Sequence, residues 1–380
     1  NFVEISKNIV DGGGHQIDRT GAGFYSWDGT TYINNSTIVN NTGAQGLFRR
    51  EGGVTVNSSI IWGNTSNDAG AITYHYTNRQ GTYPEGNGNL SQDPWFVDFD
   101  NGDYSLSPGS VCINRGDPSF DDDEDTTRRD MGAYIYEHGH LGPEWYVSPS
   151  GSFEFGDGSL GNPLSSVLAA INLANEGDVI TLAEGTYTGL GNYNIYFLGK
   201  NVTIQSEGSA ENTIIDAEGS TENGSNNRRV FAFEGHGSFG SVSSSTLIDD
   251  ITIQNGWVSG NEIYGSGSGH YGGGVYIHSS DPTFTNCIIK DNMAWRECDN
   301  CDIRGGGIYL YNSNSTFDNC EILNNYVRAD VNYNGNRDAT SRGGGVYVEG
   351  GNVGIYNSVI AGNTAYTYDH SNNGESRGYS

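Results

Sequence analysis

Short apolar runs alternate with glycine and asparagine near the end of the chain, in a pattern that occurs three times. The copies read GGGVYIHSSDPTFTNCIIKDNMA from Gly272, GGGIYLYNSNSTFDNCEILNNYV from Gly305 and GGGVYVEGGNVGIYNSVIAGNTA from Gly343. Each apolar run has the length of a strand and not of a helix. Glycine and asparagine between the runs let the backbone turn within a few residues. Each copy is therefore predicted to form one coil of a β-solenoid.

Two asparagines recur at fixed positions in each copy. One follows the first glycine by 14 residues and the other by 20, whereas the stretches between copies differ in length. Fixed length is typical of a scaffold and variable length of loops. Because one coil cannot bury its apolar face alone, we expect coils to stack about 4.8 Å apart, with like residues above like. This stacking predicts two ladders: Asn286, Asn319 and Asn357, and Asn292, Asn325 and Asn363.

At these residues the chain resembles the right-handed parallel β-helix repeats of the pectate-lyase-like superfamily, whose coils commonly read GGGI…NC.I..N.A. Residues 32–42 and 56–66 carry similar text that ends at Asn41 and Asn64. The resemblance implies an all-β fold, a right-handed parallel β-helix or solenoid. It implies no single function, because this fold hosts lyases, hydrolases, adhesins and inert spacers.

The order of segments predicts two partial solenoids in one chain. Residues 1–92 read as the C-terminal coils of a first β-helix, and residues 93–136 resemble the choice-of-anchor type of closing segment that follows many bacterial β-helices. Residues 137–144 form a linker. Residues 145–246 resemble an N-terminal cap with the first coils of a second β-helix, and residues 247–380 hold its Gly-Gly-Gly coils.

One short capping helix is predicted within the second solenoid. Asn162 and Pro163 are expected to supply its N-cap and first position, before an amphipathic run that ends at Gly177 and Asp178.

This order leads us to expect open coils at both ends of the chain. Eight linker residues reach at most about 28 Å, whereas about a dozen coils extend roughly 50–60 Å. The linker therefore cannot run back along one joint helix. Two alternatives remain: the chain is an excerpt of a tandem array, or the last coil of one chain stacks on the first coil of the next. Such a head-to-tail contact propagates into a filament.

The charge of the chain is strongly negative. Its 46 acidic against 18 basic residues give a formal net charge of −28, which disfavours nucleic acid and anionic membranes and attracts divalent cations. Solubility in a salty medium explains the same composition. No apolar stretch approaches the ~18 residues of a membrane span.

The densest acidic cluster is a candidate calcium site. Asp121, Asp123 and Asp125 have the spacing of a calcium loop, but Thr126 and Gly132 stand where an EF-hand needs glycine and glutamate. The alternatives are an irregular Ca²⁺ site or a solvated acidic loop. The candidate ligands are Asp117, Asp121, Asp123, Asp125 and Asp130.

The five cysteines fall into three groups. Cys298 and Cys301 lie in the stretch between two copies, where a loop disulfide is expected in an exported protein. Cys287 and Cys320 occupy equivalent positions in successive coils and are expected to stack as buried thiols. Cys112 is also expected to be a buried thiol.

No residue is assigned a catalytic role. Arg304 and Arg342 each precede a Gly-Gly-Gly turn and are expected to stack, but Tyr271 stands at that place in the remaining copy. Lyase chemistry needs an arginine or lysine base beside calcium-binding carboxylates, whereas ladder pairing with nearby acids explains stacked arginines equally.

Three tyrosines follow the Gly-Gly-Gly turns. Alternation predicts that Tyr276, Tyr309 and Tyr347 point away from the core. Exposed there, they would stack on sugar rings or on another subunit, or serve only as strand formers on an outer face.

We interpret the chain as a secreted or cell-surface structural or adhesive β-helix protein that stacks head-to-tail or joins tandem neighbours of its own kind. The first alternative is a pectate-lyase-like polysaccharide lyase or hydrolase. The second is a noncatalytic glycan-binding module.

Overall fold

The computed structural model describes residues 2–10, 21–81, 86–220, 227–235, 240–259, 271–297, 301–331 and 339–369. The chain divides into two compact units, Asn1–Gly139 and His140–Ser380. Within this described part, all strand pairs but one are parallel, and there is one helix. The protein is therefore a right-handed parallel β-helix, which confirms the predicted fold class.

Unit 1 has three parallel sheets around one core. The first holds β1 (Val3–Ser6), β4 (Ser36–Val39), β7 (Ile60–Trp62) and β10 (Asn78–Arg79); the second holds β2 (Phe24–Ser26), β5 (Gln45–Arg49) and β8 (Ser66–Ala69); the third holds β3 (Thr30–Asn34), β6 (Gly53–Asn57) and β9 (Ile72–His75). Their inward residues form the core: Ile33, Ile38, Leu47, Val54, Val56 and Ile61.

An aromatic segment follows the coils of unit 1. It contains the antiparallel pair β11 (Phe96–Asp98) and β12 (Asp103–Leu106). The rings of Phe96, Phe99 and Tyr104 contact one another with centroids 5.5 to 6.0 Å apart. Behind β10, the amide of Asn78 donates to the carbonyl of Gln92 and contacts the sulfur of Cys112, and all three residues are buried. These contacts cover that end of the solenoid.

Unit 2 begins with β13 (Glu144–Ser152) and the helix α1 (Val167–Leu173). The helix starts four residues later than predicted, because Leu164 pairs in extended conformation with Val147 and Ser152. The hydroxyl of Ser166, and not Asn162, caps the helix by accepting from the backbone N–H of Ala169. All seven helical residues are buried, so α1 closes this end of the solenoid.

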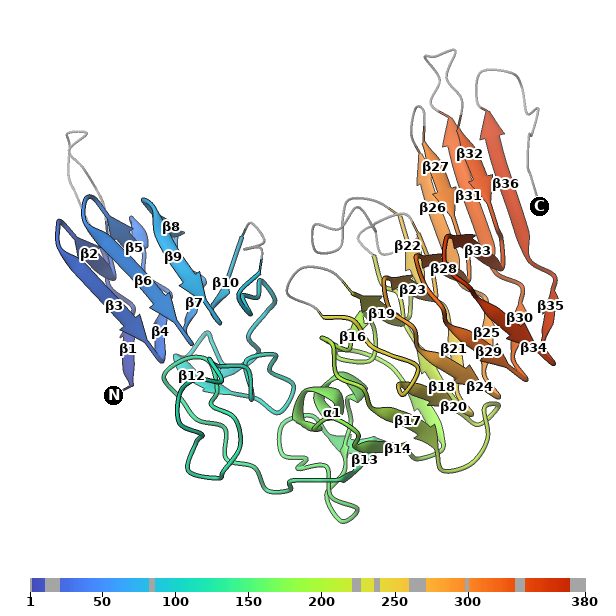
Figure 1. Cartoon of the computed structure of the whole chain (residues 1–380), viewed down its shortest axis with the longest axis horizontal. Helices are drawn as coiled ribbons and strands as arrows, with labels where there is room; N and C mark the ends of the chain where they lie inside the picture. The colour runs from blue at the N-terminus through green and yellow to red at the C-terminus, as the bar shows by residue number, and fades with distance from the viewer. Residues whose placement is uncertain are drawn as a thin grey trace. The chain divides into compact units, whose positions relative to one another are not determined.

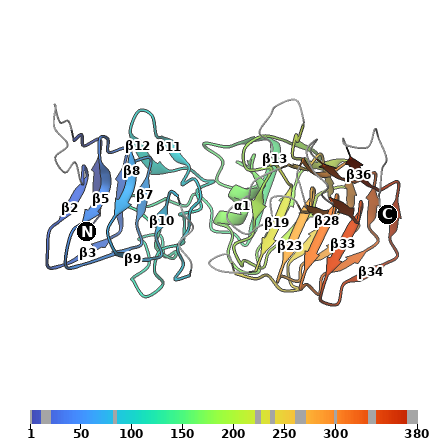
Figure 2. The same ribbon diagram turned by 90° about the horizontal axis from the view of Figure 1, so that it is seen from above.

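Three long parallel sheets run through unit 2 (Figure 1). The first joins β13 to β14 (Val179–Leu182), β17 (Thr203–Ser206), β20 (Leu247–Asp249), β24 (Thr283–Thr285), β29 (Thr316–Asp318) and β34 (Gly354–Tyr356). The second holds β15 (Gly185–Tyr187), β18 (Thr213–Asp216), β21 (Thr252–Gln254), β25 (Ile288–Lys290), β30 (Glu321–Leu323) and β35 (Val359–Ala361). The third holds β16 (Ile195–Tyr196), β19 (Phe231–Glu234), β23 (Val275–His278), β28 (Ile308–Tyr311) and β33 (Val346–Glu349), and its strands lie side by side in Figure 2.

The stretches before, between and after the copies form further strands, which we call the fin. It consists of β22 (Trp257–Val258), β26 (Met293–Glu297), β31 (Tyr326–Val331) and β36 (Thr364–Asp369), with β27 (Asp302–Arg304) and β32 (Thr340–Arg342) packed against them. Figure 1 shows these strands extending beyond the coils. The sequence predicted loops here, but stacking gives each stretch a hydrogen-bonding partner in the next coil, and Ala294, Val327 and Ile303 are buried between the layers.

Candidate functional site

One asparagine at a corner of each coil links successive coils of unit 2, and we call this row the corner ladder. The backbone N–H and the Nδ2 of Asn292 both donate to Oδ1 of Asn325, at 3.1 and 3.0 Å. Asn325 donates in the same way to Oδ1 of Asn363, at 2.8 and 3.0 Å. Each Nδ2 also donates to a carbonyl of the preceding coil, as Asn363 does to Ile322 at 2.8 Å. The bonds between ladder asparagines therefore have a direction, because each asparagine donates to the Oδ1 of the asparagine in the later coil.

Unit 1 has the same corner ladder. Asn8 donates through its backbone N–H and Nδ2 to Oδ1 of Asn41, at 3.0 and 2.9 Å, and Asn41 donates identically to Asn64. The residue before each ladder asparagine has positive φ in both units, for example 53° at Asn40 and 56° at Asp291. The corners of the two units are therefore built alike.

The second predicted row, Asn286, Asn319 and Asn357, lies at another corner. All three have φ between 51° and 54°, the left-handed region that asparagine tolerates. Asn319 donates to Asn286 at 2.8 Å, whereas Asn357 donates to Asp318 and Asn286 to Asp249. This row is thus interrupted by aspartates and does not run as one chain of amides.

The last described coil exposes residues that are buried one coil earlier. We call the strands β33, β34 and β35 the open coil. Its Val348, Ile355 and Ile360 are 44, 37 and 50% exposed. Their partners in the preceding coil, Leu310, Phe317 and Ile322, are each 0% exposed. Three adjacent rows of the core therefore end at an uncovered apolar face.

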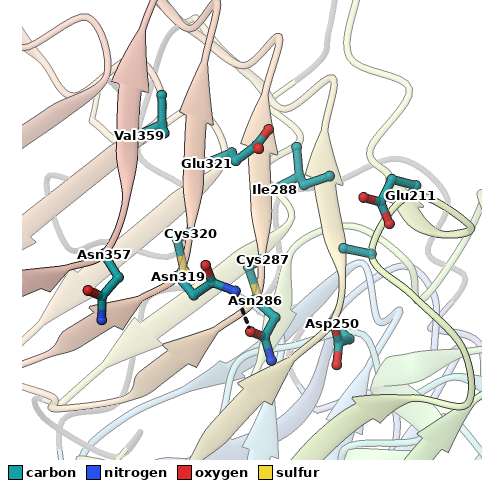
Figure 3. Close-up of a pocket in the computed structure, with 11 residues that line it drawn as sticks. Glu211, Asp250, Asn286, Cys287, Ile288, Asn319, Cys320, Glu321, Asn357 and Val359 are labelled. Carbon is teal, nitrogen blue, oxygen red and sulfur yellow. Dashed lines mark hydrogen bonds between the residues drawn. The ribbon is translucent and has the colours of Figure 1, made fainter.

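A shallow groove of about 230 Å³ runs across the coils beside the Asn286 row (Figure 3). Its polar wall consists of Asn286, Asn319 and Asn357 with Glu211, Asp250 and Glu321. The described residues that line it include no arginine, lysine or histidine. The groove therefore offers carboxylates and amides, but no base of the kind that lyase chemistry needs.

The two carboxylates at one end of the groove differ in acidity. Partial burial, reinforced by Asp249, raises the pKa of Asp250 above its usual value. The backbone N–H of Glu211 and the side chain of Ser209 hold the pKa of Glu211 below its usual value.

Two of the three tyrosines are buried and not exposed as predicted, whereas Tyr347 is partly exposed. Tyr276 and Tyr309 point away from the core, yet they are only 2 and 4% exposed. The Tyr271 ring stacks on Tyr309 with centroids 4.7 Å apart, and the Arg229 guanidinium lies 4.8 Å from the Tyr276 ring. These covering groups come from other coils, so alternation within a strand does not reveal them. The buried rings are unavailable to stack on sugars.

The stacked arginines pair with acids. Arg304 and Arg342 are register partners, and both contact Asp302, at 2.7 and 3.1 Å. Arg304 also forms an ion pair with Glu349, which accepts a hydrogen bond of 2.8 Å from the hydroxyl of Tyr309. The arginines therefore neutralise neighbouring carboxylates, as ladder pairing predicts.

Four of the five predicted calcium ligands accept from protein donors, and the fifth, Asp121, is exposed. Asp123 accepts from the backbone N–H of Asp130, Asp125 contacts Nδ1 of His138 at 2.7 Å, and Asp117 accepts from Asn57. Asp130 accepts from two backbone N–H groups, at 2.6 and 2.7 Å. Within the described ranges no group of three acidic, histidine or cysteine side chains has a metal-binding arrangement, and calcium stays a prediction.

The cysteines lie in three settings. Cys287 and Cys320 are buried in successive coils without a disulfide, which confirms the predicted pair of stacked thiols. Cys112 is buried, and burial raises its pKa to about 12. Cys301 takes part in a disulfide. Cys298 lies outside the described residues, so its pairing with Cys301 stays a prediction.

Comparisons with known proteins add distant structural matches. No protein family and no curated protein matches the sequence. A pectin methylesterase mutant in complex with a hexasaccharide matches at 14% identity and TM-score 0.27, over 49% of this chain and 55% of its own. PemA from Erwinia chrysanthemi matches at 15% and 0.26, over 57% and 65%. Carrot pectin methylesterase matches at 20% and 0.26, over 60% and 85%.

The chain therefore spans less than two thirds of the first two of these enzymes. The parallel registers described above, and not these matches, establish the fold. No helix of the described residues is long and apolar enough to cross a membrane.

Proposed function

We propose that the chain is a structural or adhesive segment of a secreted or cell-surface protein, and that its coils associate end to end with further coils of the same kind. The open coil carries this proposal. Ile360 is half exposed although its register partner in the preceding coil, Ile322, is fully buried. Covering a Val or Ile side chain fully contributes about 1.5–3 kcal/mol of stabilising free energy. A further coil stacked on the open coil would cover three such side chains at once, those of Val348, Ile355 and Ile360.

An extracellular setting is supported by the disulfide of Cys301 and by the large negative charge. Disulfides persist in oxidising compartments. A high net charge keeps an extended solenoid soluble apart from its specific contacts.

Two neighbouring residues of β35 provide the test. Val359 and Ile360 are 51 and 50% exposed, but Ile360 continues the buried row of Ile289 and Ile322, whereas Val359 follows Ile288 and Glu321 on the outer side. We expect Ile360→Lys to abolish self-association in sedimentation velocity and to remove filaments from negative-stain micrographs. Val359→Lys, with the same exposure, should leave both unchanged. Wild-type protein that stays monomeric at all concentrations would refute the proposal.

A second candidate function is polysaccharide cleavage in the groove of Figure 3. It is favoured by the lining of that groove, in which the carboxylates of Asp250, Glu211 and Glu321 lie beside the asparagine amides. Release of reducing ends from acidic and neutral polysaccharides would test it. Activity lost in both Asp250→Asn and Glu211→Gln, with unchanged melting temperatures, would support it. Equal activity in the variants would assign cleavage to a contaminant.

A further inference from the structure

We propose that Cys287 and Cys320 are a modification site: in the presence of a small-molecule disulfide as oxidant, they form a disulfide between two successive coils of unit 2. The structure shows the reduced form of this pair, with both cysteines free and buried. Both belong to coils that have a further described coil on each side. The bond would act inside the solenoid and is independent of contacts at its ends.

The backbone already holds the two cysteines at the separation that a disulfide needs. The strands before them, β24 and β29, are in register, and Ile288 after the first pairs with Glu321 after the second. The backbone N–H of Glu321 donates to the carbonyl of Cys287 at 2.8 Å. Stacked coils are about 4.8 Å apart, and disulfides usually join Cα atoms about 4.4–6.8 Å apart. Rotation of the two side chains can therefore close the bond without separating the coils.

The two thiols interact directly. Their shared hydrogen bond lowers the pKa of Cys320, whereas burial, followed by the same bond, raises the pKa of Cys287 well above its usual value. Each thiol also donates to a carbonyl of its own coil, Cys287 to Thr285 at 3.2 Å and Cys320 to Asp318 at 3.4 Å. A thiol is a weak donor, so oxidation sacrifices little. Cys320 is the member of the pair that forms a thiolate more easily.

Each cysteine has a single cysteine neighbour in its row. The equivalent position is Ile251 in the coil before and Ser358 in the coil after. The hydroxyl of Ser358 accepts from the backbone N–H of Cys320 at 2.9 Å. A bridge in this row therefore joins these two coils and no others among the described residues.

Thiol–disulfide exchange with a small disulfide completes the electron balance. The Cys320 thiolate attacks one sulfur of the reagent, which forms a mixed disulfide and releases one small thiolate, and this thiolate takes up the proton of Cys320. The Cys287 thiolate then attacks the Cys320 sulfur and displaces the second small thiolate, which takes up the proton of Cys287. The two cysteines lose two electrons, and the reagent is reduced to two thiols.

Burial controls when this exchange can occur. Both cysteines line the groove and occupy neighbouring coils in Figure 3, but they are only 0 and 1% exposed. Attack on the folded protein is therefore slow, and the bond closes fastest while the coils are still assembling. The disulfide of Cys301 is of the kind that persists in oxidising compartments, where such exchange is available.

The bridge would brace the middle of the repeat region. Cys320 follows Cys287 by 33 residues, and a cross-link over such a loop restricts the unfolded chain. It also adds a covalent bond between coils that are otherwise joined by packing and by hydrogen bonds such as that from Asn319 to Asn286 at 2.8 Å. We expect the oxidised form to melt roughly 5–10 °C above the reduced form.

Peptide mapping of two preparations tests the proposal. The whole chain is secreted through an oxidising compartment or made in a reducing cytosol, then denatured with an alkylating reagent and digested without reductant. We expect the secreted protein to give one peptide pair linked through Cys287 and Cys320, with Cys112 alkylated. The cytosolic protein should give all three residues alkylated, and prolonged incubation with oxidised glutathione should convert it to the linked form.

Matched variants assign the change in melting temperature. The disulfide of Cys301 also responds to reductant, so the comparison uses a background with Cys298→Ser and Cys301→Ser. Cys320→Ser should abolish the difference between oxidised and reduced protein, and its serine is accommodated in this row at position 358. Cys112→Ser, which removes a buried thiol of unit 1, should leave the difference unchanged.

The outcomes decide the proposal even where one variant folds poorly, because peptide mapping uses the wild-type chain. Alkylated Cys287 and Cys320 in the secreted protein, with no linked peptide after incubation with oxidised glutathione, would overturn it. A linkage of either residue to Cys112 would also overturn it. A linked peptide pair together with a melting difference that Cys320→Ser removes would establish the bridge and its bracing effect.

Discussion

The coil of β28, β29 and β30 and the open coil have the same rows of side chains but different surroundings. Phe317 and Ile355 are register partners, as are Ile322 and Ile360, yet the first of each pair is fully buried and the second is 37 or 50% exposed. Equivalent positions of successive coils are thus occupied by a core residue in one coil and by a surface residue in the next. In a solenoid, burial depends on the neighbouring coil and not on the coil's own sequence.

The largest effect is expected when the buried aromatic side chain of Phe317 is truncated. Phe317 stacks on Phe284 with ring centroids 4.9 Å apart, inside the first long sheet of unit 2. Phe317→Ala should cost about 3–5 kcal/mol of unfolding free energy, because a cavity remains between covered coils. Ile355→Ala should cost only about 1 kcal/mol in the monomer, since a third of that side chain is already in water.

Urea unfolding followed by circular dichroism would measure both changes, at a concentration where the chain is monomeric. Equal losses for the two variants would mean that the open coil is covered in solution within a single chain.

The corner ladder gives the next largest contrast. Asn325 is buried and serves both neighbours, so Asn325→Ala leaves the buried amide of Asn292 without its acceptor. We expect a loss of about 2–4 kcal/mol, because a buried donor without a partner costs about 1–3 kcal/mol. Asn363→Ala also removes the acceptor of the buried Asn325, but it should cost less in the monomer, because water can reach the half-exposed Asn363 site and replace that acceptor. Hydrogen exchange at the Asn292 N–H offers a direct reading, and unchanged protection there in Asn325→Ala would contradict the ladder.

These contrasts show what the sequence could predict. Repeated spacing revealed the coils, because the same side chains must stand above one another for the coils to stack. Burial of Tyr276 was missed because its cover, Arg229, belongs to an earlier coil and is not part of the repeat. The start of α1 was misplaced because Leu164 pairs with residues more than ten positions away in the chain.

The same limit applies to the fin and to the corner ladder. The stretches between copies vary in length, which is typical of loops, but neighbouring coils provide strand partners for them. The positions of the ladder asparagines could be predicted from their constant spacing in the sequence. The direction of their hydrogen bonds could not. That direction exists only in three dimensions.

The arginines provide a smaller contrast of the same kind. Arg304 in β27 forms ion pairs with Asp302 and Glu349, while Arg342 in β32, one coil later, pairs with Asp302 among the described residues and has a side chain that is 45% exposed. Arg304→Met should lower the unfolding free energy by about 1 kcal/mol, and Arg342→Met by less than about 0.5 kcal/mol, as is usual for exposed ion pairs. Thermal melts at low and high salt would show whether the Arg304 loss persists under screening. A larger loss of unfolding free energy in Arg342→Met than in Arg304→Met would contradict this expectation.

Ionic strength should have the smallest effect, and it should act on the open coil rather than on the interior. Each chain carries a formal net charge of −28, so two copies repel as they approach. Because the screening length falls from about 30 Å at 0.01 M salt to about 8 Å at 0.15 M, added salt should strengthen association severalfold while shifting the melting temperature of the monomer little.

Calcium at matched ionic strength separates screening from binding. If CaCl₂ and NaCl promote association equally, screening suffices. Extra stabilisation by calcium that disappears in Asp123→Asn and Asp125→Asn would instead place the ion in the acidic segment of unit 1. The comparison then distinguishes two roles for the same charge, because repulsion between copies acts at the open coil, whereas a bound cation would act within one unit.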